Sequence, residues 1–256
     1  MARVCTLASG SSGNSILLSD CGRHILIDMG ISLKKTSSAL AQLGLSVSDL
    51  SAILITHSHS DHISGLNTLC KKWSVPVLCT KQAAMGIISS CPEAKRNLLV
   101  FEAGSTFNLK GFGVASFPTP HDSDGSVCYR ISCSCVDIGI MTDLGCVPPN
   151  ILEGMEGVRA IVIEFNHDVN RLAMGPYPYH LKQRILSDRG HLSNEAAGDA
   201  ALWLAQRGTS GFILAHLSKE NNTPQLAYAA ATTALRDIDG VKIFVSSPEM
   251  SAPIEF

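Results

Sequence analysis

The stretch that decides the fold is Ala52-Ile53-Leu54-Ile55-Thr56-His57-Ser58-His59-Ser60-Asp61-His62. Its first four residues form a continuous apolar run, which is typical of a buried strand. Three histidines and one aspartate then follow within the six residues from His57 to His62. Imidazole and carboxylate groups suit zinc, manganese or iron. The stretch therefore predicts a metal-binding loop between a buried strand and a helix.

The spacing inside this loop predicts two neighbouring metal positions. His57 and His59 lie two residues apart, so an extended segment points both side chains the same way. Asp61 and His62 follow the turn into the helix, so they can point at a second position. One loop can serve two ions if other segments supply the remaining ligands.

Three more candidate ligands each stand just past an apolar strand: they are His121, Asp143 and His216. A single histidine at a strand end is usually an ordinary core or surface residue. Here, however, five of the nine histidines fall in the loop or at these strand ends. A carboxylate such as that of Asp143 can bridge two cations. Each ion would then have three or four protein ligands and room for a shared hydroxide.

Composition predicts one large α/β domain spanning residues 1–256, with 45% apolar and 16% charged residues. The net charge of -2 gives no overall attraction to nucleic acid, so a phosphate-rich substrate would need a local patch or a metal. Nine scattered cysteines suggest free thiols in a reducing compartment. No signal peptide and no apolar stretch of about 20 residues is seen, so we expect a cytoplasmic protein without a membrane partner.

Strand-rich and helix-flanked segments occur twice along the chain. In the first half we predict strands over 4–7, 15–19, 24–28, 52–55 and 75–79, and helices over 33–43, 62–72 and 82–89. In the second half we predict strands over 107–109, 113–117, 126–132, 136–141, 160–164, 212–215 and 241–245, and helices over 193–206 and 223–236. The pattern fits two sheets packed face to face, but a doubly wound parallel sheet also gives short buried strands.

The loop resembles the H-x-H-x-D-H signature of the metallo-β-lactamase superfamily, and the later ligands come in that superfamily's order. The resemblance implies an α/β fold, a four-layer αββα sandwich with two divalent metal ions at one edge of the sheets. Zinc is the first expectation, with manganese or iron as alternatives. By resemblance, the first ion is held by His57, His59 and His121. The second is held by Asp61, His62 and His216, with Asp143 as the bridging ligand.

A narrower resemblance is to the WalJ/YycJ family of bacterial cytoplasmic proteins, which is linked to DNA exonuclease activity. The segments that carry it are LASGSSGNS at 7–15, LIDMGIS at 26–32, EFNHD at 164–168, GHLSN at 190–194 and LAHLSKENNTP at 214–224. No inserted domain separates Asp143 from Glu164, which argues against the large β-CASP nucleases. Asp143 stands where true metallo-β-lactamases usually carry cysteine, which argues against antibiotic hydrolysis.

Two further residues are candidates for catalysis beside Asp61. The arrangement of Glu164 and His191 resembles that in ribonuclease Z, where the matching histidine assists at the scissile phosphate. A buried carboxylate at the end of a strand needs a partner, and His191 is the natural partner of Glu164. We expect Asp61 both to bind the second ion and to orient the hydroxide.

The candidates for substrate binding are Asn14, Ser218 and Asn221. Asn14 lies in a Ser/Gly-rich turn that could offer amides to a phosphate or could be a plain hairpin. Ser218 and Asn221 precede a predicted helix and could contact substrate at its N-terminus or could simply cap it. A modest basic cluster, Lys182, Arg184 and Arg189, precedes His191; it is either a solvated helix face or a contact to a phosphate backbone.

Together these features predict a dinuclear metal-dependent phosphodiesterase, a nuclease of the DNA exonuclease type, that uses a metal-bridging hydroxide as its nucleophile. Nucleic acid or another phosphodiester is the expected partner. An alternative is a hydrolase of a small ester, thioester or lactone, because the same metal pair polarises a carbonyl. A third possibility is a binding module without activity, but degenerate members of such families usually lose ligands and this chain keeps all seven.

Overall fold

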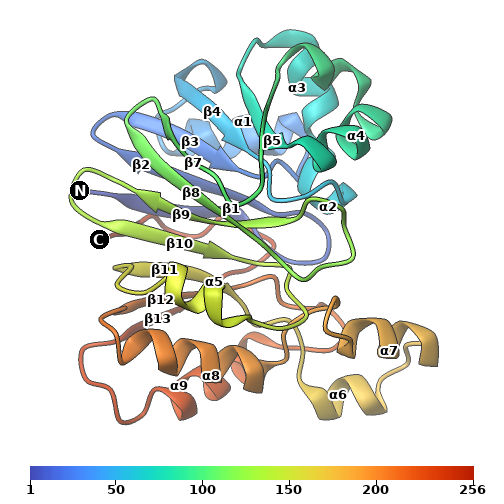
Figure 1. Cartoon of the computed structure of the whole chain (residues 1–256), viewed down its shortest axis with the longest axis vertical. Helices are drawn as coiled ribbons and strands as arrows, with labels where there is room; N and C mark the ends of the chain where they lie inside the picture. Colours follow the sequence, from blue (N-terminus) through green and yellow to red (C-terminus); the bar gives the residue numbers. More distant parts are fainter.

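The computed structural model describes residues 1–256 as two seven-stranded sheets packed face to face, with helices on both outer faces (Figure 1). The first sheet has the order β14-β1-β2-β3-β4-β5-β6, with β1 Arg3–Ala8, β2 Ser15–Asp20, β3 Arg23–Ile27, β4 Leu50–Leu54, β5 Val77–Thr80, β6 Leu98–Phe101 and β14 Ile254–Glu255. The second has the order β13-β12-β11-β10-β9-β8-β7, with β7 Thr106–Leu109, β8 Phe112–Pro118, β9 Val127–Ser132, β10 Asp137–Met141, β11 Ala160–Glu164, β12 Gly211–Ala215 and β13 Lys242–Val245.

The two sheets share one pairing pattern. Each begins with three antiparallel pairs, from β14 to β3 in the first sheet and from β7 to β10 in the second. Each then continues with three parallel pairs, from β3 to β6 and from β10 to β13. This repeat confirms the prediction that strand-rich and helix-flanked segments occur once in each half of the chain. It excludes a single doubly wound parallel sheet.

Helices form the outer layers. The helices are α1 Leu33–Gln42, α2 Ser60–Ile63, α3 Leu66–Lys72, α4 Lys81–Ser90, α5 Pro149–Gly154, α6 Val169–Met174, α7 Tyr179–Leu186, α8 Asn194–Ala205 and α9 Pro224–Ala234. Helices α1, α3 and α4 cover the first sheet, and α5, α8 and α9 cover the second (Figure 1). Helices α2, α6 and α7 lie at the edge opposite the two chain ends.

Three separate hydrophobic clusters explain the four layers. One fills the space between the sheets, and each of the others joins a sheet to its own helices. Along β3, Ile25 and Ile27 face the other sheet while Leu26 faces the helices, since alternate residues of a strand point to opposite faces. Strands that are buried on both faces have continuous apolar sequences, and the run from Ala52 to Ile55 is an example. The αββα sandwich that the resemblance implied is confirmed.

Some elements differ from the predicted pattern. The helix predicted over 62–72 is two helices, α2 and α3, because the chain bends at Ser64 and Gly65. The N–H of Gly65 donates to the carbonyl of Met29 (2.9 Å), which ties the bend to the end of β3. The pattern also missed short elements with few buried residues, namely β6, β14, α5, α6 and α7. No helix is both long and apolar enough to cross a bilayer.

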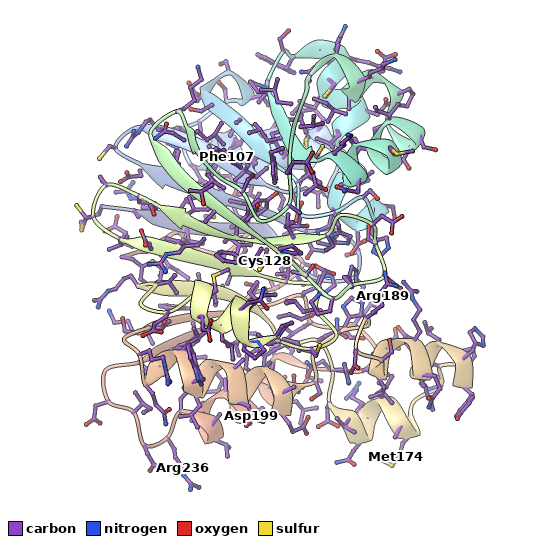
Figure 2. The ribbon with its side chains drawn as sticks, in the orientation of Figure 1. Phe107, Cys128, Met174, Arg189, Asp199 and Arg236 are labelled. Carbon is purple, nitrogen blue, oxygen red and sulfur yellow. The ribbon has the colours of Figure 1, made fainter.

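The strands that carry the predicted ligands all deliver them to one edge of the sandwich, because β3, β4, β8, β10, β11 and β12 end on the same side. Figure 2 shows Arg189 at this edge, whereas Asp199 and Arg236 lie on the helical layer of the second sheet. Parallel strand ends that meet at one edge place residues far apart in sequence side by side.

Three backbone segments interlock at this edge. The N–H of Asn14 donates to the carbonyl of Asp61, that of Met29 to the carbonyl of His62, and that of Gly30 to the carbonyl of Asn14, all at 2.8 Å. Gly30 lies so close to the histidine loop that a Cβ there would stand 1.6 Å from the carbonyl oxygen of Asp61. Only glycine fits this contact.

We predict that Gly30→Ala lowers the free energy of unfolding by about 3 kcal/mol or more, because the added carbon meets backbone that cannot rotate away. Gly44→Ala is the matched control: its Cβ would meet nothing within 4 Å, but φ is +73°, so a loss of only about 1–2 kcal/mol is expected. Urea unfolding of both metal-free variants measures the difference. Equal losses would show that the close approach at Gly30 is unimportant.

Candidate metal centre

The histidine loop begins where β4 ends and closes with the first turn of α2. His59 is the N-cap of α2 in extended conformation, with φ -64° and ψ 149°. Asp61 and His62 lie in the helical turn, so their side chains leave the backbone in a different direction from those of His57 and His59. This local geometry separates the loop's four candidate ligands into two groups, as the spacing predicted.

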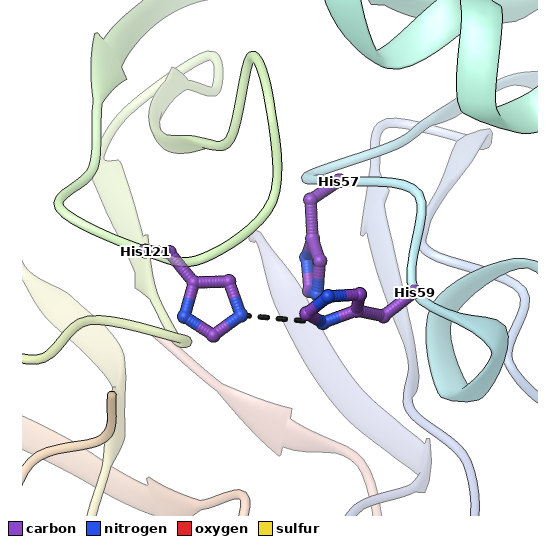
Figure 3. Close-up of side chains that lie close together, drawn as sticks. All are labelled: His57, His59 and His121. Carbon is purple, nitrogen blue, oxygen red and sulfur yellow. Dashed lines mark hydrogen bonds between the residues drawn. The ribbon is translucent and has the colours of Figure 1, made fainter. Parts of the chain in front are cut away.

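The first group comprises His57, His59 and His121, whose candidate ligand atoms all lie within 4.8 Å of one another (Figure 3). His121 comes from the loop after β8, and its Nε2 lies 3.3 Å from Nδ1 of His59. Burial, together with the neighbouring imidazoles, lowers the pKa of His57 well below its usual value. Burial also lowers the pKa of His59 and His121. These rings are therefore neutral at pH 7, the state in which imidazole binds metal.

The second group comprises Asp61, His62 and His216, again with ligand atoms within 4.8 Å of one another. The carboxylate Oδ2 of Asp61 lies 3.4 Å from Nε2 of His62 and 3.5 Å from Nε2 of His216. Burial raises the pKa of Asp61, but hydrogen bonds to His216 and His62 outweigh it and hold that pKa well below its usual value.

Asp143 lies between the two groups. Its carboxylate oxygens are 3.4 Å from Nε2 of both His62 and His216, and 4.0 Å from Nε2 of His121. It follows β10 with φ +61°, and His216 follows β12 with φ +56°. Residues other than glycine rarely adopt this left-handed backbone conformation, and backbone strain of this kind is often found at functional sites. Asp143 therefore lies within reach of side chains from both groups.

Two buried polar atoms at the centre make no hydrogen bond: Nε2 of His57 and Oδ2 of Asp143. Buried polar atoms almost always have partners, since an unsatisfied one costs about 1–3 kcal/mol. Both atoms belong to the residues predicted to bind metal, and all surrounding donors are imidazole or carboxylate. The residues present therefore fit two divalent cations, which would satisfy both atoms.

Several residues orient the candidate ligands from behind. The carboxylate of Asp28 accepts hydrogen bonds from the N–H and hydroxyl of Thr56 and pairs with Nδ1 of His62, all at 2.8 Å. The amide of Asn166 donates to the carbonyl of His216 at 2.9 Å. The contact of Asp28 with Nδ1 of His62 leaves Nε2 of that ring facing Asp143, whereas the contact of Asn166 fixes the backbone of His216. Partners of this kind commonly fix the ring and tautomer of a metal-binding histidine.

Glu164, at the end of β11, is completely buried and touches both His191 and His216. Its Oε1 lies 2.7 Å from Nδ1 of His191 and 2.9 Å from Nδ1 of His216. The predicted pairing of Glu164 with His191 is confirmed. Burial lowers the pKa of His191, but the Glu164 carboxylate outweighs it and raises that pKa above the usual value. Nε2 of His191 makes no hydrogen bond within the protein and remains available to a ligand.

A cavity of about 310 Å³ opens onto these groups. Residues from both sheets and from α7 line it, among them His59, Asp61, Asp143, His191, His216 and Arg184. Arg184 forms an ion pair with Asp122, whose Oδ1 lies 3.5 Å from Nε2 of both His59 and His121. Asp122 was not among the residues predicted from the sequence. Its position directly after the candidate ligand His121 could have identified it as a residue of this site.

The basic cluster predicted before His191 is dispersed. Arg184 lines the cavity, whereas Arg189 donates to the carbonyl of His121 at 3.0 Å, and Lys182 donates to the carbonyl of Ala173. Of these three residues, only Arg184 lines the cavity. His191 itself lies in the loop before α8, whose N-cap is Ser193.

The three predicted substrate-binding residues have different surroundings. Ser218 lines the cavity. Asn14 is buried behind it, and its amide nitrogen lies 3.3 Å from Oδ2 of Asp61 and 3.1 Å from Nε2 of His62. Asn221 is completely buried, its backbone carbonyl accepts the N–H of Asp168, and it does not line the cavity. The predicted substrate contact of Asn221 therefore stays a prediction, and in this structure the residue lies outside the lining of the cavity.

Comparison with known proteins agrees with this geometry. Residues 23–217 match the family model described as the beta-lactamase superfamily domain. The chain is 37% identical to the exodeoxyribonuclease WalJ of Streptococcus pneumoniae, covering 97% of this chain and 95% of WalJ. It is 34% identical to the exodeoxyribonuclease YycJ of Bacillus anthracis, covering 98% and 97%. The metallo-β-lactamase fold protein YhfI of Bacillus subtilis superposes over 100% of both chains with a TM-score of 0.75 and 16% identity.

We predict that zinc binding to the metal-free protein at pH 7 releases protons. Burial alone would lower the pKa of His62, but the carboxylates of Asp143 and Asp28 raise it to about 10. His62 is therefore protonated at pH 7 and must lose its proton to bind metal through Nε2. Titration calorimetry in two buffers of different ionisation enthalpy counts the protons, and at least one per chain is expected.

Asp28→Asn is the matched variant for this measurement, because it removes one of the charges that raise the pKa of His62. It should release fewer protons per chain than the parent protein does. If zinc binds the parent with no proton release, the assignment of His62 as a ligand is wrong.

Proposed function

The chain belongs to the beta-lactamase superfamily and to the family of the exodeoxyribonucleases WalJ and YycJ, and on that premise we propose that it is a dinuclear metal-dependent phosphodiesterase that hydrolyses DNA. The observation that carries the proposal is Asp143, a buried carboxylate between two groups of candidate metal-binding side chains, with one oxygen that accepts no hydrogen bond within the protein. An aspartate at this position suits a bridging ligand between two cations.

We assign the first ion to His57, His59 and His121, and the second to Asp61, His62 and His216, with Asp143 shared. Histidine and carboxylate ligands favour zinc, and manganese or iron suit the same set. When bound, the two ions would supply a hydroxide nucleophile near neutral pH and positive charge for the phosphate oxygens.

Asp61 lines the cavity as an ionised carboxylate, since its pKa lies well below the usual value. It can therefore accept a hydrogen bond from the attacking water or hydroxide and hold it in line with phosphorus. Asn14 donates to Oδ2 of Asp61 and so restricts the rotation of this carboxylate. The role of Asn14 in this account is to position Asp61, and substrate contact is left to Ser218.

His191 supplies the proton for the leaving group. Glu164 holds its Nδ1, and the raised pKa favours the protonated ring, in which Nε2 presents a proton to the cavity. As the bond between phosphorus and the leaving oxygen breaks, that oxygen takes the proton from Nε2. General acids of this kind contribute about 10²–10⁴-fold to the rate. Glu164 touches no substrate and acts as a positioning residue for His191 and His216.

We predict that His59→Ala and Asp143→Ala abolish hydrolysis of bis-p-nitrophenyl phosphate while each variant keeps its fold by circular dichroism. Each substitution removes a ligand of one or both ions. Metal content measured on the same samples separates lost ligands from lost structure. Full activity in either variant, with metal verified absent, would refute the proposal. Faster turnover of a thioester or lactone than of any phosphodiester would favour the alternative small-ester hydrolase.

We predict that His191→Gln lowers kcat on DNA about 10²–10⁴-fold and removes the alkaline limb of its pH profile. The acid form of His191 is the active one, so activity is present below its raised pKa and is lost as pH rises through it. Glu164→Gln should move this limb to lower pH because it removes the charge that raises the pKa. His180→Gln, an exposed change on α7, is the control. An unchanged alkaline limb in His191→Gln would contradict the assignment.

A further inference from the structure

A second cavity, of about 350 Å³, adjoins the catalytic cavity on the side of α9. Three residues line both cavities: Ser11, Tyr177 and Ser218. A molecule bound at the metal centre can therefore extend into the second cavity past a shared wall. None of the roles assigned above uses this space, apart from that of Ser218.

The lining of the second cavity combines apolar surfaces with hydroxyl groups. Leu217, Pro224, Pro248 and the half-buried ring of Tyr177 supply the apolar surfaces. Serine hydroxyls surround them, and the lining holds one lysine and one glutamate, whose charges cancel. Flat apolar groups beside hydrogen-bonding groups suit a nucleobase joined to a sugar, since base-aromatic stacking accepts any base.

One polar atom of this lining lacks a partner. Ser246 is 4% exposed, and its hydroxyl makes no hydrogen bond within the protein. The N-terminus of α9 lies beside the same cavity, because Asn222, Thr223 and Pro224 line it. The partial positive charge of a helix N-terminus favours an anionic group such as a phosphate. A buried hydroxyl without a partner therefore coincides with an electrostatically suitable place for a sugar or phosphate oxygen.

We propose that the second cavity is the subsite for the nucleotide that adjoins the scissile phosphodiester. The base stacks on Tyr177 against Pro224 and Pro248, and a sugar or phosphate oxygen accepts the hydrogen bond of Ser246. This inference rests on the proposed function, because it takes the scissile phosphate to lie at the metal centre. Tyr177, at the boundary of the two cavities, is then a residue that sets the preference for nucleotides over simple phosphodiesters.

The test compares substrates that share one leaving group. Methyl p-nitrophenyl phosphate lacks a nucleoside, whereas the p-nitrophenyl esters of thymidine 5′-phosphate and thymidine 3′-phosphate carry one in either orientation. The ratio of kcat/KM for each thymidine ester to that for the methyl ester isolates the contribution of the nucleoside. We expect the metal-loaded protein to prefer at least one thymidine ester. Tyr177→Leu should reduce that preference about fivefold or more, in keeping with the loss of one stacked base.

Tyr179→Leu is the matched control, because this tyrosine lies two residues away, is 77% exposed and lines neither cavity. It should keep the full preference, and Ser246→Ala should reduce it by a smaller factor than Tyr177→Leu. An unchanged preference in Tyr177→Leu, or an equal loss in Tyr179→Leu, would overturn the subsite.

Failure of the proposed function has a different signature, in which none of the three esters is hydrolysed at any metal content. The subsite is then judged by saturation-transfer NMR with thymidine 5′-monophosphate. Signal from the base in the parent protein, lost in Tyr177→Leu and kept in Tyr179→Leu, supports the subsite. Absence of any signal in the parent protein overturns it.

Discussion

The rest of the structure depends on a buried group of imidazoles and carboxylates whose polar atoms are not all hydrogen-bonded within the protein. Seven candidate ligands converge at one edge of the sandwich, and two of their buried atoms have no hydrogen-bond partner. Collecting such groups in a buried place costs free energy unless cations balance them. The strained backbone at Asp143 and His216 adds to that cost. The fold supports this arrangement through a large apolar core on both sides of each sheet.

The architecture explains why the ligands meet. Each sheet places the ends of several strands at the same edge, and the two sheets face each other, so loops from both halves surround one centre (Figure 1). The first sheet supplies the histidine loop and Asp28, while the second supplies His121, Asp143, Glu164 and His216. The close backbone contact at Gly30 holds the histidine loop against the turn that carries Asn14. The centre therefore depends on both halves of the chain.

Much of this could be predicted from sequence, because the ligand types follow apolar strands directly and strand ends converge. The groups formed by His57, His59 and His121, and by Asp61, His62 and His216, are brought together as expected. Apart from the pairing of Glu164 with His191, which was expected, most contacts between distant segments could not be predicted from the local pattern. Asp28 pairs with a histidine 34 positions away, and Asn221 is buried by packing that no local spacing indicates. The proposed role of Tyr177 follows only from the two cavities that it lines, and these are not visible in the sequence.

The central claim is that two cations at this centre drive phosphodiester hydrolysis. The most direct measurement adds zinc or manganese stepwise to the metal-free protein and follows cleavage of end-labelled single- and double-stranded DNA, with bound metal determined on the same samples. The account predicts no cleavage without metal and a rate that rises until two ions are bound per chain. Cleavage by the metal-free protein, or none with two ions bound, would contradict it.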